Sequence, residues 1–225
     1  MQYNTDVKII QYLCDTFKDT IDINKQDNDG NNALMLAAQY NTNEKVIQHL
    51  CDTFKDTIGI NMVDNDGQTT LMIAARYNTN EKVTQHLCDT FKDTIDINMV
   101  DDDGYTACMY LITDRNRYVR TPYGTNTHSL CKMEEHEDTS DKVIQYLYDM
   151  FKDTIDINKQ NKKGYTALML AVRHNSKTKV IQYFCDTFKD IIDINKQDND
   201  GYTAFMVAIQ YNMNIAVIQH LYDTF

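Results

Sequence analysis

The sequence contains little glycine and almost no proline. Seven glycines and one proline occur in 225 residues, well below the usual shares of about 7% and 5%. A chain of this length needs many turns, and glycine and proline are the residues that most often form them. Other residues must therefore form most of the turns.

Long apolar runs and clusters of basic residues are also missing. Runs such as Ala33–Ala38 are far shorter than the roughly 18 apolar residues of a transmembrane helix, and the first residues lack the pattern of a secretory signal. The net charge of −11 disfavours nucleic acid as a partner, because a phosphate-binding face needs clustered Lys and Arg. We therefore expect a soluble, cytoplasmic protein that binds neither membrane nor nucleic acid.

Five of the seven glycines recur at a fixed step along the chain. They are Gly30, Gly67, Gly104, Gly164 and Gly201, separated by 37, 37, 60 and 37 residues. Phenylalanine keeps the same step from Phe17 to Phe225. A fixed period between 20 and 50 residues is typical of a solenoid. The sequence therefore predicts one array over 1–225, with an insertion of 23 residues in its third unit.

The period also predicts where the units begin and end. We expect a half unit at 1–23, then units at 24–60, 61–97, 98–157, 158–194 and 195–225. The third unit holds the insertion, about 113–138, and the last one stops within its second helix. Because the end of a solenoid normally carries a polar capping unit, we expect a longer array or end helices that something else covers.

Hydrophobic periodicity predicts two helices in each unit. The first, Thr70–Tyr77, is apolar nearly all round and has Thr70 or Thr69 as its N-cap. The second runs from about Asn43 to Ile58, with apolar residues at steps of three and four. The Asp-Gly pairs between units favour hairpin turns. The expected fold is all-α dominated, a helix-turn-helix solenoid with short β-hairpin loops.

These units resemble the ankyrin repeat. An ankyrin unit has 33 residues, a turn and two helices, and its first helix starts with Thr-Pro-Leu-His. The matching tetrads, such as Thr166-Ala167-Leu168-Met169, replace the Pro and carry Met instead of His, while the Asp-x-x-Gly-x-Thr entry and the closing Asp-Ile-Asn look like the family. The composition is similar in style to ankyrin families of giant DNA viruses and some protists, whose setting would be host cytoplasm.

Two further departures from the ankyrin pattern concern the second half of each unit. Four extra residues fall between Val46 and Asn61, which predicts about one more turn in the second helix. Asn41, Asn78 and Asn212 stand between the two helices, where ankyrin units usually carry glycine. Asn tolerates a left-handed backbone better than most residues, which indicates that it replaces glycine in this role.

Four of the six cysteines occupy one repeat position on the apolar side of the second helix. They are Cys14, Cys51, Cys88 and Cys185. Stacked helices lie about 10 Å apart, whereas a disulfide needs Cα atoms within about 7 Å. We therefore expect buried free thiols and a reducing compartment.

No pattern in the sequence indicates chemistry. His128, Cys131 and His136 have loosely zinc-like spacing, but a structural zinc site needs four ligands with paired short spacings. The Asp-x-Asp-Gly turns fail as calcium loops, because Lys25 and Leu36 fall at ligand positions. Phosphate-binding, zinc-protease and nucleophile-elbow motifs do not occur. We expect no metal, no cofactor and no enzyme activity.

Positions that differ between units indicate where a partner binds. The resemblance implies protein–protein recognition on a concave face formed by hairpin tips and first helices. The column after the glycine turns aromatic along the array, and tyrosine is favoured in interfaces. The aspartates of the tips either build turns only or flank a protein-binding strip. The predicted strip comprises Met62, Val63, Met99, Val100, Tyr105, Tyr165, Tyr202, Asp101 and Asp103.

Other interpretations stay open at this point. The insertion at about 113–138 is either a flexible loop or a recognition loop of this protein. The array is either a binding module or a passive spacer within a longer ankyrin chain. Viral relatives often recognise substrates for ubiquitin ligases, although no F-box-like or BTB-like segment is visible here.

Overall fold

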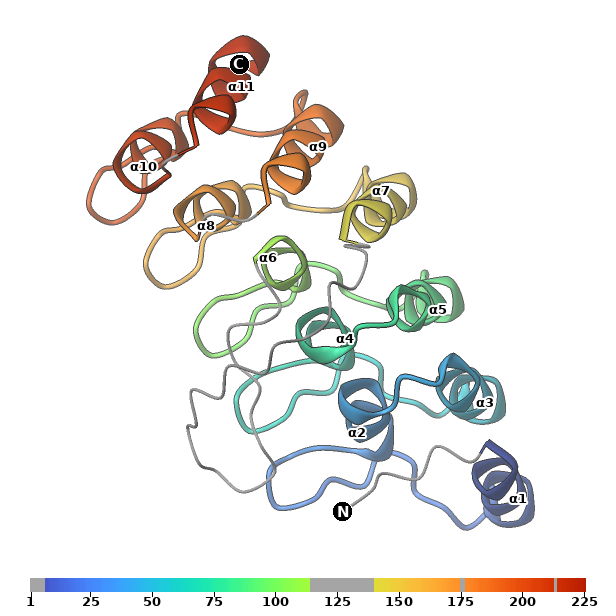
Figure 1. The fold of residues 1–225 in the computed structure, drawn as a ribbon. Helices are drawn as coiled ribbons and strands as arrows, with labels where there is room; N and C mark the ends of the chain where they lie inside the picture. Colours follow the sequence, from blue (N-terminus) through green and yellow to red (C-terminus); the bar gives the residue numbers. More distant parts are fainter. Residues whose placement is uncertain (1–6, 114–139, 175–176, 213) are drawn as a thin grey trace.

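The computed structural model describes residues 7–113, 140–174, 177–212 and 214–225 (Figure 1). Within these residues the chain forms helices that follow one another in pairs, each pair joined to the next through a turn. The helices are α1 (Val7–Phe17), α2 (Ala33–Tyr40), α3 (Glu44–Phe54), α4 (Thr70–Tyr77), α5 (Glu81–Phe91), α6 (Ala107–Ile112), α7 (Ser140–Phe151), α8 (Ala167–Arg173), α9 (Thr178–Phe188), α10 (Ala204–Tyr211) and α11 (Ile215–Thr224).

The helices stack in two parallel rows. The first helices of the units, from α2 to α10, contact one another in one row, and the second helices, from α1 to α11, form the other (Figure 1). The hairpin turns project from the first-helix row on the side away from the second helices. Within the described ranges, β pairing is limited to the bridges Val63–Thr69 and Gln197–Thr203. The predicted helical solenoid is therefore confirmed.

A threonine side chain starts most of the first helices. Helix α4 begins at Thr70, as predicted, and the Oγ1 atom of Thr69 accepts a hydrogen bond from the Met72 N–H at 3.3 Å. Such a cap takes one of the N–H groups that has no partner within the helix. The same cap is formed by Thr106, Thr166 and Thr203, and by Asn32 in the first complete unit.

The second helices are shorter than the sequence predicts. Helix α3 ends at Phe54 rather than near Ile58. The backbone N–H groups of Thr57 and Ile58 both donate to the Phe54 carbonyl at 2.9 Å, and the Thr57 hydroxyl donates to it at 3.1 Å. Three donors on one carbonyl close the chain into a turn. The predicted extension of this helix is therefore wrong.

In the first four complete units an asparagine at the start of the unit is joined by two hydrogen bonds to the loop that follows the second helix of that unit. The Asn24 Nδ2 atom donates to the Thr57 carbonyl at 2.7 Å, and its Oδ1 atom accepts from the Gly59 N–H at 2.8 Å. We call this pair of bonds the Asn clamp. It recurs from Asn61 to Thr94 and Asp96, from Asn98 to Thr154 and Asp156, and from Asn158 to Ile191 and Asp193.

The asparagines between the two helices have an extended rather than a left-handed backbone. Asn78 has φ −85° and ψ 124°, and Asn41 and Asn212 are similar. The proposed glycine-like role is therefore wrong. Asn78 is buried, and its Nδ2 atom donates to the Ala38 carbonyl of the preceding unit at 2.7 Å. Buried carbonyl groups need a hydrogen-bond partner, and the amide of asparagine provides it.

Most glycines of the hairpins are required for two separate reasons, their backbone conformation and the close approach of the next hairpin. Gly104 has φ +83°, a conformation that side chains rarely adopt. A Cβ atom at this position would also lie 2.8 Å from the backbone nitrogen of Lys162 in the next hairpin. Gly201 has φ +84°, but a Cβ atom there would meet nothing within 4 Å.

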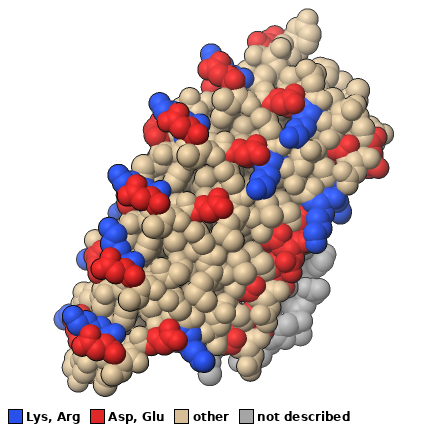
Figure 2. Space-filling view, turned by 180° about the vertical axis from the view of Figure 1, so that it is seen from behind, with Lys and Arg blue, Asp and Glu red and all other residues tan. Residues whose placement is uncertain are grey.

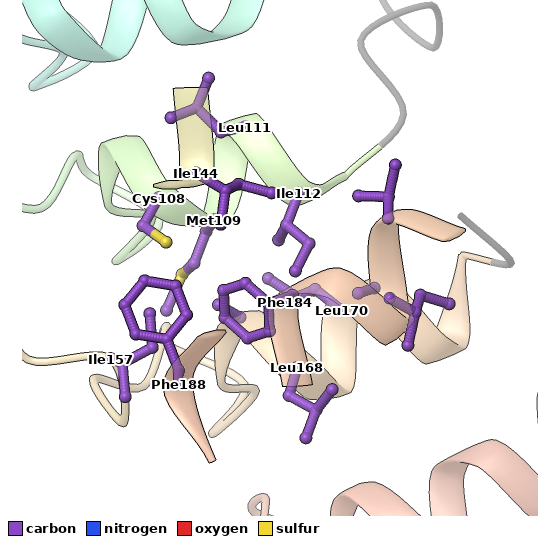
Figure 3. Packing of buried hydrophobic residues seen from close by; sticks show 14 of the residues in the cluster. Cys108, Met109, Leu111, Ile112, Ile144, Ile157, Leu168, Leu170, Phe184 and Phe188 are labelled. Atoms are coloured by element: carbon purple, nitrogen blue, oxygen red, sulfur yellow. The ribbon is translucent and has the colours of Figure 1, made fainter. Parts of the chain in front are cut away.

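The apolar core runs between the two helix rows. Figure 3 shows Phe184 and Phe188 of α9 lying close to Met109 of α6 and Leu170 of α8, all of them buried. The two phenylalanine rings are 4.9 Å apart between centroids. Each unit thus buries its apolar faces against its neighbours, which is the stabilising arrangement of a solenoid.

The column of cysteines belongs to this core. Cys14, Cys51, Cys88 and Cys185 are buried free thiols, as predicted. Burial, with a smaller contribution from the adjacent aspartate, raises the pKa of Cys51, Cys88 and Cys185 to about 12. A thiol with such a pKa is uncharged and unreactive at neutral pH.

Candidate binding surface

The first aspartate of each hairpin builds the turn. The Asp101 Oδ1 atom accepts from the Asp103 N–H at 3.0 Å and from the Tyr105 N–H at 2.8 Å, and Asp101 is 7% exposed. Equivalent bonds are made by Asp27, Asp64, Asn161 and Asp198. Asp101 therefore lies beneath the predicted strip, and Asp103 is exposed on it.

Neighbouring hairpins are joined by backbone hydrogen bonds. The Asp102 N–H donates to the Asp66 carbonyl at 3.0 Å, and the Lys162 N–H donates to the Asp103 carbonyl at 3.0 Å. Glutamine side chains add a second link between some of them. Gln26 Nε2 donates to the Val63 carbonyl at 2.7 Å, and Gln160 Nε2 donates to the Gln197 carbonyl at 2.7 Å.

Two adjacent units have valine in the place of this glutamine. Val63 and Val100 share the register of Gln26 and Gln160, and they are 38% and 37% exposed. A valine cannot donate the side-chain hydrogen bond, so these units lose the second link and expose an apolar group instead. The methionines of the predicted strip differ, because Met62 and Met99 are partly buried against the core.

The predicted column of tyrosines has three different environments. Tyr202 is 39% exposed, as a binding residue should be. Tyr105 is half-buried, and its ring stacks on that of Tyr110 with the centroids 5.3 Å apart. Tyr165 is only 9% exposed, because the side chain of Arg173 covers its ring. Tyr165 therefore lies inside the surface, which corrects its place in the predicted strip.

Two arginines that the sequence analysis did not select stand beside this column. The guanidinium of Arg76 lies 4.9 Å from the ring centroid of Tyr77 and 5.0 Å from that of Tyr110. The guanidinium of Arg173 lies 5.1 Å from Tyr165 and 4.3 Å from Tyr211. Cation–π contacts form within about 6 Å of a ring centroid. We call the two groups the Arg–Tyr sandwiches.

A signal for these sandwiches was present in the sequence. Arg76 and Arg173 share one register position on the first helix, where Gln39 and Gln210 stand in other units. The four rings occupy three register positions, one of which is shared by Tyr77 and Tyr211. The contacts of the arginines with Tyr110 and Tyr211 arise from the packing of neighbouring first helices.

Two of the phenol groups beside the arginines have a raised pKa. The Tyr110 hydroxyl donates to the Asp101 Oδ2 atom, and burial together with this bond raises the pKa of Tyr110. Burial also raises the pKa of Tyr165, and the charge of Arg173 opposes that rise. Over the part of the chain that the structure describes, neither arginine forms an ion pair with a carboxylate.

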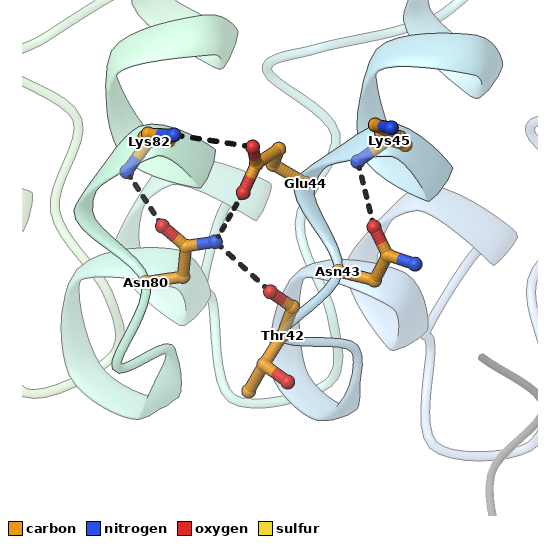
Figure 4. A network of polar contacts seen from close by, with 6 residues as sticks. All are labelled: Thr42, Asn43, Glu44, Lys45, Asn80 and Lys82. Atoms are coloured by element: carbon orange, nitrogen blue, oxygen red, sulfur yellow. Dashed lines mark hydrogen bonds and ion pairs between the residues drawn. The ribbon is translucent and has the colours of Figure 1, made fainter.

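A separate polar network joins the second helices near their N-terminal ends (Figure 4). The Asn80 Nδ2 atom donates to the Thr42 carbonyl at 2.9 Å and to a Glu44 carboxylate oxygen at 2.8 Å. The Lys82 ammonium lies 3.3 Å from the other oxygen of Glu44. These donors hold the pKa of Glu44 below its usual value. The network links the N-terminal ends of α3 and α5, the second helices of neighbouring units. Its contacts hold these two helices together.

The face seen in Figure 2 carries charges of both signs. Acidic and basic side chains stand beside one another in rows along the array. Along the sequence a Lys-Asp pair directly follows a second helix in several units, for example the exposed Lys55 and Asp56 after α3. Interspersed charges of this kind are typical of a solvated surface.

The described ranges contain neither a candidate metal site nor a helix that could span a membrane. No group of three or more His, Cys, Asp or Glu residues is placed there to hold a metal ion. None of the helices described is long and apolar enough to span a membrane. His128, Cys131, His136 and nearly all of the predicted insertion lie outside the described residues.

Comparison with known proteins supports the expected resemblance. The family model of ankyrin repeats in three copies matches residues 134–224. A chain from the solved complex of the predatory endopeptidase Bd0816 from Bdellovibrio bacteriovorus with the immunity protein Bd3460 is similar in fold, with a TM-score of 0.65 and 20% identity over 99% of both chains. No curated protein matches the sequence. Residues 134–224 are therefore similar in sequence to ankyrin repeats.

Proposed function

We propose that the chain is a non-catalytic module that binds a protein partner on the side formed by its hairpin tips and first helices. This is the side that the sequence predicts to be concave. The observation that carries the proposal is the pair of exposed valines, Val63 and Val100. They replace glutamines that link hairpins elsewhere in the array, so the fold does not require them.

The residues around the valines support the same role. Tyr202 and Asp103 are exposed on this side, and Met62, Met99 and Tyr105 are partly buried beneath it. Interfaces commonly combine aromatic and apolar groups with a polar rim. In this proposal Tyr165 and Asp101 position the surface, because both are buried.

The thiols support a cytoplasmic setting for this function. Each cysteine in the described ranges is free and buried. Free thiols of this kind persist where the compartment is reducing. We therefore propose the cytoplasm as the location in which the partner is bound.

The test compares the wild-type chain with the double variant Val63→Gln, Val100→Gln in affinity capture from cytosol. Glutamine occupies this register in three other units, so the variant should fold as well as the wild type. We expect a saturable partner on the wild type and much less of it on the variant. The control is Ile191→Thr, which removes a 39% exposed apolar residue beyond the second helices.

Four outcomes decide between the interpretations. Loss of capture in the double variant alone supports the proposal. Equal capture by all three proteins contradicts the role of the valines. The absence of any saturable partner favours a passive spacer, while a ubiquitin ligase component among the captured proteins would favour the adaptor alternative.

A further inference from the structure

Both arginines of the described residues are held in the same way. Arg76 ends the apolar part of α4 and reaches Tyr110 on α6, and Arg173 ends α8 and reaches Tyr211 on α10. Each guanidinium thus bridges two neighbouring first helices and contacts two rings. Although the chain has 33 acidic residues, neither guanidinium forms an ion pair with a carboxylate of the described residues.

Each guanidinium lies beside two tyrosine rings and uses few of its N–H donors within the described residues. Arg173 uses one N–H, which donates to the Tyr165 hydroxyl at 2.9 Å. For Arg76 no hydrogen bond to another described residue is found. A guanidinium has five N–H donors in a planar fork that matches a carboxylate. Both side chains are half-buried, so the forks are fixed and still reachable from solvent.

The carboxylate of Asp101, which binds the hydroxyl of Tyr110 beside Arg76, is already occupied. Asp101 accepts two backbone N–H groups through one oxygen and the Tyr110 hydroxyl through the other. It therefore has little capacity to bind Arg76 as well. A carboxylate of a partner would meet guanidinium N–H donors that are held in place and are not used in other hydrogen bonds. This arrangement favours a charge-assisted pair.

Charge near the second sandwich also favours an acidic partner. The hairpin of the unit that holds Arg173 carries Lys162 and Lys163, both exposed, where other hairpins carry aspartate or asparagine. The positive charges of this unit therefore lie on the hairpin and on the first helix together. Asp198 and Asp200 of the next hairpin also lie close enough to act on Tyr165, so this positive charge is local to unit 158–194 in an array whose net charge is −11.

The spacing of the two sandwiches defines the shape of the partner. Arg76 and Arg173 occupy one register position two units apart, with Thr113 between them. Packed helices are about 10 Å apart, so two units span about 20 Å. An extended chain rises about 3.3 Å per residue, which places two of its side chains about six residues apart at that distance.

We propose that the Arg–Tyr sandwiches bind two carboxylate side chains, about six residues apart, in an extended acidic segment of the protein partner. This inference rests on the proposed function, because it names the chemistry of the segment that the same side would bind. The arginines are contact residues for the partner, and the tyrosines position them.

The test uses fluorescently labelled peptides of 12 residues and the whole chain, with binding followed by anisotropy. One peptide carries two glutamates six positions apart in a Ser-Ala background, a second carries them three apart, and a third has glutamine in place of both. We expect the first to bind tightest. Arg76→Lys and Arg173→Lys should each weaken it about tenfold, because lysine keeps the charge but lacks the fork.

The matched control is Lys179→Gln, which removes an exposed positive charge from α9 on the second-helix row. It should leave peptide affinity unchanged, whereas Arg173→Gln should reduce it. Thermal melting of each variant shows that it is folded. Equal binding of the glutamate and glutamine peptides, equal affinity at both spacings, or tighter binding of an oligonucleotide of equal charge would overturn the inference.

The two proposals can fail separately. If a saturable partner depends on Val63 and Val100 but the glutamate peptides do not bind, only the carboxylate inference is contradicted. The lack of any saturable partner in the capture experiment sinks the proposed function itself.

Discussion

The guanidinium of Arg173 on α8 lies 4.3 Å from the ring centroid of Tyr211 on α10. The contact crosses from one unit of the array to the next. In repeat proteins, stability is roughly the sum of the stability of each unit and of the contacts between neighbours. Tyr211 is 42% exposed, so solvent weakens the attraction to about 1 kcal/mol.

A double-mutant cycle measures this contact. Arg173→Gln, Tyr211→Leu and the double variant are unfolded with urea, and we expect a coupling free energy of about 0.5–1 kcal/mol between the two sites. A coupling of zero would show that the two side chains do not stabilise the joint between α8 and α10.

Replacing the Asn61 side chain should loosen the array. Asn61→Ala removes the Asn clamp to the Thr94 carbonyl and the Asp96 N–H, both at 2.9 Å or less. Loss of two such bonds is expected to lower the free energy of unfolding by about 1–3 kcal/mol. The measurement is chemical unfolding.

The chain offers its own control for this variant. Asn195 has the same register position, and its side chain makes no clamp to another described residue. Asn195→Ala should therefore change the stability by less than about 0.5 kcal/mol. A similar loss of stability in both variants would show that the effect comes from the backbone preference of asparagine at this register position and not from the clamp.

Gly104→Ala and Gly201→Ala separate backbone strain from close packing. Both glycines have φ near +83°, so each alanine should cost about 1 kcal/mol in backbone strain. Only at Gly104 would the new Cβ atom meet the next hairpin, at 2.8 Å. We expect Gly104→Ala to lose at least about 1 kcal/mol more in thermal unfolding, and equal losses would contradict a tight joint between hairpins.

The buried thiols predict that stability falls in alkali. The pKa of Cys51, Cys88 and Cys185 is about 12 in the folded chain, against about 8.5 for a free thiol. The contribution is complete below pH 8.5 and is lost as the pH rises toward 12, because only the unfolded thiols release their protons.

The measurement compares the wild type with a Cys51→Ala, Cys88→Ala, Cys185→Ala variant at pH 8 and pH 10.5. The wild type should lose more stability between these values, by about 2–3 kcal/mol for each thiol. Tyrosines and lysines titrate in both proteins, so they cancel. An equal loss in the two proteins would show that the thiols ionise while folded.

Features that repeat along the chain could be predicted from the sequence. The start of α4 at Thr70, its cap at Thr69 and the buried column of cysteines are confirmed. They depend on local helix and capping propensities and on the spacing of apolar residues, and both can be read from the sequence. The end of α3 at Phe54 was missed because it depends on hydrogen bonds from Thr57 and Ile58 that close a turn.

The surface was harder to predict than the core. Tyr105, Tyr165 and Tyr202 share one register, yet one is half-buried, one is buried and one is exposed. The difference comes from neighbours outside the register, such as Arg173 over Tyr165. A column in the sequence says which residues are equivalent in the fold, but the side chains around each one decide what it can bind.

The Asn clamp makes the length of the array easy to change by recombination. If residues 62–98, one period of 37 residues, were lost, the Asn61 amide would face Thr154 and Asp156 in place of Thr94 and Asp96, which are the same residue types in the same positions. The junction would offer the same carbonyl and N–H group. Unequal crossing-over at whole periods can therefore shorten or lengthen the solenoid while every surviving joint keeps compatible partners.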